Sequence, residues 1–142
     1  MNPRNLLLVA MCVGMFLVQL DVTVVNVALP RIADDLGTTI EGQQWIVAGY
    51  TVVLASLLLA GGTTGDRYGH KRVVLTGLTT FGVASVLCGA APNVGILVAG
   101  RALQGVGAAL LLPGTLAVIT RAFPGQAEQA HAVGIWAGVS AL

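Results

Sequence analysis

Four long apolar stretches constrain the fold of this chain more than any other feature of its sequence. A helix needs about 20 largely apolar residues to cross the hydrocarbon core of a bilayer. Stretches of that length lie at about residues 6–29, 45–64, 73–91 and 95–119, and a truncated fifth covers 131–142. Only 9% of the 142 residues are charged, too few to cover a soluble core. We therefore predict an all-α membrane protein with four complete transmembrane helices and the start of a fifth.

The connections between these stretches carry most of the charges and indicate an orientation. They are expected at residues 30–44, 65–72, 92–93 and 120–130. Basic residues near the ends of spans are retained in the cytoplasm. One side of the predicted bundle carries Arg4, Arg67, Lys71, Arg72 and Arg121; the other carries Arg31 with Asp34, Asp35 and Glu41. We expect a multi-pass protein of the cell (plasma) membrane with a cytoplasmic N-terminus.

Asp21 is an ionisable residue deep inside the first apolar stretch. A carboxylate in hydrocarbon costs a few kcal/mol on insertion scales, so such a residue is a candidate for a functional site. A second polar face of the same helix lies roughly opposite and comprises Gln19, Thr23 and Asn26. Because unsatisfied polar groups are costly in lipid, we expect this helix to be central, between a water-accessible cavity and a neighbouring helix. The alternative is an Asp21 that merely bonds a neighbouring helix.

Arg101 is a second charge inside an apolar stretch, and Gln104 and Gly105 share its helix face. At about 1.5 Å per residue from the outer ends, Asp21 lies roughly 13 Å deep and Arg101 roughly 10 Å deep. Their matched depth and opposite charge lead to the hypothesis of a direct or water-bridged link. Proton binding at Asp21 would loosen that link and so couple protonation to a change of shape. The alternative for Arg101 is snorkelling to the outer interface.

Glycines and the charged turn at residues 65–72 add two further predictions. The nineteen glycines favour a tight bundle, because helices in lipid associate through close packing that small residues permit. In the turn, Asp66 is surrounded in the sequence by Arg67, Lys71 and Arg72. An anchor would need only the positive charges, so the acid and the glycines favour a specific structural role. We expect His70 to be a solvated loop residue.

Three segments resemble motifs of the major facilitator superfamily, in the expected order. GTTGDRYGHKRV is similar to the motif between the second and third spans, with Thr64 and His70 where Leu and Arg are usual. Its matching residues are Gly62, Asp66, Arg67, Gly69 and Lys71. LVAGRALQGVGAA resembles the fourth-span motif and matches at Arg101, Gln104, Gly105 and Gly107. LDVTVVNVALPRI resembles the first-span motif of the fourteen-span drug:proton antiporter branch and matches at Leu20, Asp21, Thr23, Asn26, Ala28, Leu29 and Pro30.

The resemblance implies that residues 1–142 are an incomplete N-terminal transmembrane half of a proton-coupled multidrug efflux transporter, inactive alone. It implies proton coupling by Asp21 and Arg101. It implies a gating loop of Gly62, Asp66, Arg67, Gly69, Lys71 and Arg72. Cavity or helix-packing positions are Gln19, Thr23, Asn26, Gln104, Gly105 and Gly107. The implied partners are membrane lipid, amphipathic or cationic substrates and the remaining helices of the transporter, with the proton gradient as energy source and no cofactor.

Two other functions stay open. One is a facilitator for a different solute, and the other is a short membrane protein that assembles with a partner without transporting. An enzyme is disfavoured because the sequence has no nucleophile–base pair, phosphate loop or metal-ligand spacing. No basic run suggests binding to nucleic acid. Cys12 and Cys88 lie in apolar runs, which favours packing roles over a disulfide framework.

Overall fold

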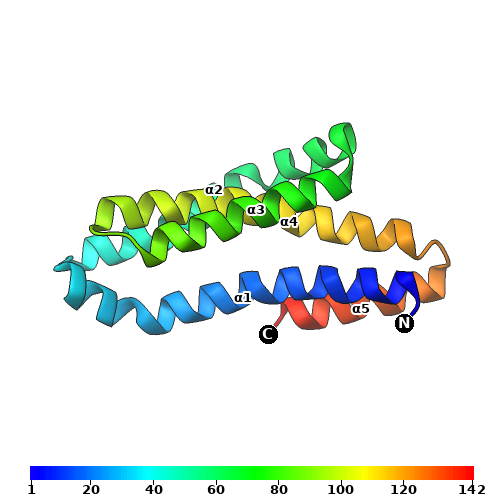
Figure 1. Ribbon diagram of the computed structural model, residues 1–142, viewed down its shortest axis with the longest axis horizontal. Helices are drawn as coiled ribbons and strands as arrows, with labels where there is room; N and C mark the ends of the chain where they lie inside the picture. Colours follow the sequence, from blue (N-terminus) through cyan, green and yellow to red (C-terminus); the bar gives the residue numbers. More distant parts are fainter.

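The computed structural model describes residues 1–142 and contains five helices and no strands. These are α1 (Pro3–Leu36), α2 (Ile40–Tyr68), α3 (His70–Gly89), α4 (Val94–Ala122) and α5 (Gln126–Ser140). The first four are long and apolar enough to cross a membrane. They alternate in direction, so the α2–α3 and α4–α5 connections lie at the end that holds the N-terminus (Figure 1). The predicted all-α membrane fold is confirmed, and the basic connections share one end of the bundle.

The connection between α1 and α2 is much shorter than the predicted 30–44. α1 continues through Pro30 to Leu36 and is capped by Gly37, whose φ of 64° lies in the left-handed region. The amides of Gly37 and Thr38 both donate to the carbonyl of Ala33. α2 follows directly after Thr39, whose hydroxyl accepts from the amide of Gly42 at 3.3 Å. The glycine and threonine caps are therefore the true boundaries, since a transmembrane helix tolerates an internal proline.

The charged turn at residues 65–72 is also almost wholly helical. Tyr68 ends α2 and His70 begins α3, so that Gly69 alone joins the two helices. Its φ of 93° is one that residues with a side chain rarely adopt. The other predicted turn is present at Pro92–Asn93, where the Asn93 side chain caps α4 by accepting from the Ile96 amide at 2.9 Å.

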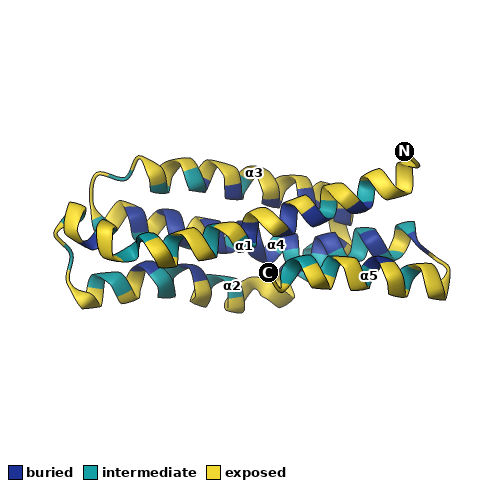
Figure 2. Cartoon of the chain, turned by 90° about the horizontal axis from the view of Figure 1, so that it is seen from below, coloured by how far each residue is buried: buried dark blue, intermediate teal, exposed yellow.

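Within residues 1–142 the helix enclosed by the others is α4, while α1 packs against it and leaves its second polar face open, so the central place expected for the first helix stays a prediction. α4 contacts each of the other four helices. Half of its most apolar 18-residue stretch is buried, compared with 28% for α1. Buried residues gather around α4, while the outer faces of the surrounding helices are exposed (Figure 2). The physical reason is that α4 has small residues on several faces, which lets neighbours approach from all sides.

Close packing at glycines draws α2 and α3 onto α4. A Cβ added at Gly105 would lie 2.7 Å from the Tyr50 carbonyl of α2, and one added at Gly107 would lie 2.8 Å from the Gly77 carbonyl of α3. Neither distance leaves room for a side chain. The predicted tight bundle is confirmed at these two positions.

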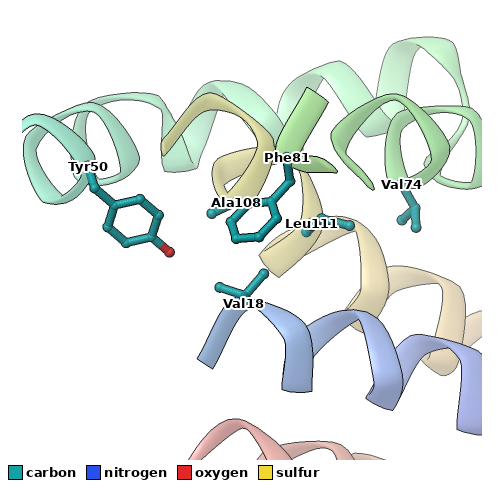
Figure 3. Packing of buried hydrophobic residues seen from close by; sticks show 6 residues of the cluster. All are labelled: Val18, Tyr50, Val74, Phe81, Ala108 and Leu111. Atoms are coloured by element: carbon teal, nitrogen blue, oxygen red, sulfur yellow. The ribbon is translucent and has the colours of Figure 1, made fainter. Parts of the chain in front are cut away.

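The main apolar cluster lies where α1 meets the α2–α3–α4 group. It contains Val18, Tyr50, Val74, Phe81, Ala108 and Leu111, contributed by four helices (Figure 3). Val18 is the member from α1, and it is only 2% exposed. This contact fixes α1 against α4 at the turn that precedes Asp21.

Candidate functional site

The candidate site is built around a contact between the two charges inside the apolar stretches. Asp21 Oδ2 accepts a hydrogen bond from Arg101 Nη1 at 2.6 Å. The side chains are 17% and 3% exposed, respectively. The hypothesis of a direct link between Asp21 and Arg101 is confirmed, and Arg101 does not snorkel to the interface.

Backbone and aromatic groups of α2 hold the guanidinium of Arg101 in place. Arg101 Nε donates to the carbonyl of Ile46 at 3.3 Å. Its Cζ lies 4.5 Å from the centre of the Tyr50 ring, within range of a cation–π interaction. A buried charge needs such partners on every side, because taking an ion out of water costs several kcal/mol. Arg101 is therefore fixed by α1, α2 and α4 together.

Gln104 lies one turn beyond Arg101 on α4 and extends the polar network to α3. Its Oε1 accepts from Arg101 Nη1 at 2.8 Å, and its Nε2 donates to Asp21 Oδ1 at 2.9 Å. Nε2 also donates to Ser85 Oγ at 3.0 Å, and Cys88 Sγ donates to Oε1 at 3.4 Å. Both carboxylate oxygens of Asp21 thus accept hydrogen bonds from side chains of α4.

Sequence reasoning missed Tyr50, Ser85 and Cys88 as neighbours of the pair. The available signal was that Tyr50 and Ser85 are polar residues inside apolar stretches, where polar groups need partners. The periodicity of one helix does not reveal which side chains of two other helices lie opposite Arg101 and Gln104.

A groove between α1 and α3 reaches Asp21 and Ser85 and has a volume of about 340 Å³. Its walls are otherwise formed by Leu17, Leu20, Val24, Leu78, Phe81 and Gly82. Another groove, of about 750 Å³, lies between α1 and α5 near the N-terminus and does not reach Asp21. There Arg4 Nη1 and Glu128 Oε2 form an exposed ion pair at 3.0 Å.

The second polar face predicted for α1 lies away from this network. Thr23 and Asn26 are exposed, and Gln19 is half-buried. The hydroxyl of Thr23 donates to the carbonyl of Gln19 at 3.1 Å, within the same helix. No other helix of this chain satisfies these side chains through hydrogen bonds. Their exposure leaves this face of α1 open to water or to further protein.

At the other end of α2 and α3, Asp66 pairs with His70. Asp66 Oδ1 lies 3.0 Å from His70 Nε2. His70 is only 7% exposed, so the expectation of a solvated loop histidine is wrong. The one-residue joint at Gly69 places the two side chains next to each other across the boundary between α2 and α3. The basic residues around them in the sequence, Arg67, Lys71 and Arg72, are exposed and form no ion pair with Asp66.

The His70 ring is seated against Gly65 of α2, where an added Cβ would overlap the ring. Its Nδ1 is buried and has no hydrogen-bond partner. The tautomer that fits carries its hydrogen on Nε2 and donates to Asp66, because a hydrogen on Nδ1 would have no acceptor. The turn motif is therefore a packed joint between two helices.

Gly65→Ala is expected to lower the free energy of unfolding by about 1–3 kcal/mol, because the new methyl group displaces the His70 ring. Thermal unfolding of the intact protein in detergent measures the effect. Gly62→Ala is the matched control, since its added Cβ would come no closer than 3.8 Å to Pro113. Equal stability of the two variants would contradict the described seat of His70.

Comparison with known proteins identifies the family. Residues 11–142 match the sequence model of the Major Facilitator Superfamily. The chain belongs to this superfamily. It is 44% identical over 133 residues to the puromycin resistance protein pur8 of Streptomyces alboniger, covering 94% of this chain and 26% of that protein. It is 41% identical over 132 residues to the methylenomycin A resistance protein of Bacillus subtilis, covering 93% and 28%.

A third relative is the multidrug resistance protein Stp of Mycobacterium tuberculosis. It is 38% identical over 143 aligned residues, which cover 100% of this chain and 27% of Stp. The chain therefore spans about a quarter of the length of these major facilitator relatives.

The structure brings two of the three major facilitator motifs together. The first-span motif supplies Asp21, and the fourth-span motif supplies Arg101 and Gln104. In the same fourth-span motif, Gly105 and Gly107 serve packing against α2 and α3. The turn motif lies at the end of the bundle that holds the N-terminus (Figure 1).

Proposed function

We propose that this chain is the N-terminal part of a proton-coupled multidrug efflux transporter of the plasma membrane. The observation that carries the proposal is the buried pair of Asp21 and Arg101 in the apolar part of two membrane-length helices. Intramembrane ionisable residues that pair with each other are typical of proton and ion pathways. The names of the relatives, which are multidrug and puromycin resistance proteins, support drugs as the substrates, and we propose that these are amphipathic or cationic compounds.

The proposed coupling begins with a proton that enters from outside and binds the carboxylate of Asp21. Neutralising Asp21 removes the charge that holds Arg101 Nη1, so the contact between α1 and α4 weakens. A change of this kind shifts a protein between two conformations only if the proton binds one of them more tightly. The strong contacts to the ionised carboxylate supply such a difference, because they are present only in the paired arrangement.

The remaining parts of the site have roles in the same proposal. The exposed face formed by Gln19, Thr23 and Asn26 lines the substrate cavity together with helices of the other half. The basic end of the bundle faces the cytoplasm. The turn motif of Gly62, Asp66, Arg67, Gly69, Lys71 and Arg72 controls alternating access at that end. Its packed joint at Gly69 and His70 supports a mechanical role over that of a simple charge anchor.

The test uses the intact transporter reconstituted in vesicles with an imposed pH gradient and a fluorescent lipophilic cation as substrate. We expect gradient-driven transport of the cation, which stops when a protonophore collapses the gradient. Residues 1–142 alone are expected to give no transport, because alternating access requires two halves to rock around a shared site. Transport that follows only the substrate gradient would indicate a facilitator, and no transport by the intact protein would favour a partner-binding role.

A further inference from the structure

The side-chain amide of Gln104 has the only orientation that its charged neighbours allow. Gln104 is 1% exposed, and both ends of its amide are used. Arg101 carries only donors, so it requires the amide oxygen. An ionised Asp21 carries only acceptors, so it requires the amide nitrogen. In the opposite orientation the amide nitrogen would face the N–H donors of Arg101, and the amide oxygen would face the carboxylate of Asp21.

The two α3 groups beside the amide are compatible with either orientation. The hydroxyl of Ser85 accepts from Gln104 Nε2 and donates to the Phe81 carbonyl at 2.9 Å. A hydroxyl can instead donate to an amide oxygen, and a thiol such as that of Cys88 is both a weak donor and a weak acceptor. Only Asp21 and Arg101 therefore select the orientation.

Protonation of Asp21 removes one of these two constraints. The new O–H group of Asp21 would have no acceptor, because both neighbours of the carboxyl group, Arg101 Nη1 and Gln104 Nε2, are donors. A buried donor without an acceptor is unfavourable. If the amide turns by half a rotation, its oxygen accepts from the carboxyl group and from Ser85. The amide nitrogen then faces Arg101, which loses its second acceptor.

We propose that Gln104 is the positioning residue that senses the protonation of Asp21 by turning its side-chain amide, and that this turn releases Arg101. The inference rests on the proposed function, since it assumes that Asp21 is the proton site. The ionisable groups that surround the amide are Asp21 of α1, Tyr50 of α2, Cys88 of α3 and Arg101 of α4. Those of α5, Glu128 and His131, line the separate groove between α1 and α5.

Infrared difference spectra of the intact transporter, recorded across a pH titration, test this proposal. The carboxylic acid band of Asp21 is assigned by its loss in Asp21→Asn, and the amide carbonyl band of Gln104 by its loss in Gln104→Met. We expect the amide band to shift with the same pH midpoint as the carboxyl band, and to stay constant in Asp21→Asn. An amide band that does not move while Asp21 titrates would overturn the proposal.

Ser85→Ala provides a second test that leaves Asp21 and Arg101 untouched. In the ionised state Ser85 Oγ contacts the nitrogen of the amide and not its oxygen, so the loss of Ser85 should leave the Gln104 carbonyl band in place. In the turned state the amide oxygen would accept from Ser85, so the same loss should shift that band. We therefore expect the carbonyl band of the protonated state to move to higher frequency in Ser85→Ala, because the turned amide oxygen loses one donor. Thr79→Ala is the matched control, because that hydroxyl bonds only the Leu75 carbonyl of its own helix.

Equal carbonyl bands in the protonated states of Ser85→Ala and Thr79→Ala would also overturn the proposal, even if Gln104→Met fails to fold. A failure of the proposed function looks different. In that case Asp21→Asn retains proton-driven efflux, whatever the two infrared bands do.

Discussion

Asp21→Asn is expected to reduce proton-driven efflux by the intact transporter to the level of vesicles without a pH gradient. Asparagine has nearly the same shape and still offers an oxygen to Arg101, but it cannot bind and release a proton. Without a proton site at position 21, the pH gradient can no longer favour one conformation of the transporter over the other. The measurement is gradient-driven transport of a lipophilic cation in reconstituted vesicles.

Two controls separate proton coupling from folding in this experiment. Asp34→Asn makes the same chemical change at an exposed carboxylate near the end of α1 and should leave coupled efflux unchanged. Asp21→Asn should retain exchange of substrate between the two sides of the membrane, since its contact surface is preserved. Full gradient-driven efflux by Asp21→Asn would rule out Asp21 as the essential proton site.

Arg101→Met is expected to produce the largest loss of stability, about 3–5 kcal/mol. Removing one partner of a buried ion pair leaves the other charge without compensation, and that costs more than the pair contributes. In this variant Asp21 keeps only the hydrogen bond from Gln104, and Tyr50 loses its cation–π partner. Thermal and denaturant unfolding of the intact transporter in detergent measure the effect.

The double variant Asp21→Asn with Arg101→Met identifies the origin of this loss. If an uncompensated carboxylate causes it, removing that charge should recover a large part of the lost stability, as a double-mutant cycle reveals. Arg121→Met is the matched control, because Arg121 is exposed at the end of α4 and should change stability by less than about 0.5 kcal/mol. Similar losses in Arg101→Met and Arg121→Met would contradict a structural role for the buried pair.

The stability cost and the proposed transport role come from the same geometry. Asp21 of α1 bonds Arg101 and Gln104 of α4, and these two residues in turn bond α2 and α3, so one polar network joins four helices. We therefore expect a change of one proton at Asp21 to affect the packing of all four helices. A simple polar contact between two helices would involve only those two helices.

Helix boundaries show where sequence reasoning succeeded and where it failed. The turn at Pro92–Asn93 was predictable because Asn93 is a typical N-cap residue. Pro30 was a misleading stop signal, since α1 passes through it to Leu36 and is capped by Gly37. Gly69 was expected inside a turn of several residues, but it forms the whole joint between α2 and α3. Local signals compete, and contacts with other helices decide which of them ends a helix.

The membrane class, the family motifs and the matched depth of the two charges could be predicted from the chain alone. These follow from composition and from the constant rise of a helix, which are local properties. The contact between Asp21 and Arg101 was predictable because the two residues have opposite charges at similar depth. Three features could be read only from the folded chain: α4 is the enclosed helix, His70 is buried against Gly65, and Ser85 and Tyr50 join the pair. The physical reason is that Asp21 and Arg101 are 80 residues apart, and the rotation of each helix about its axis depends on how all its neighbours pack.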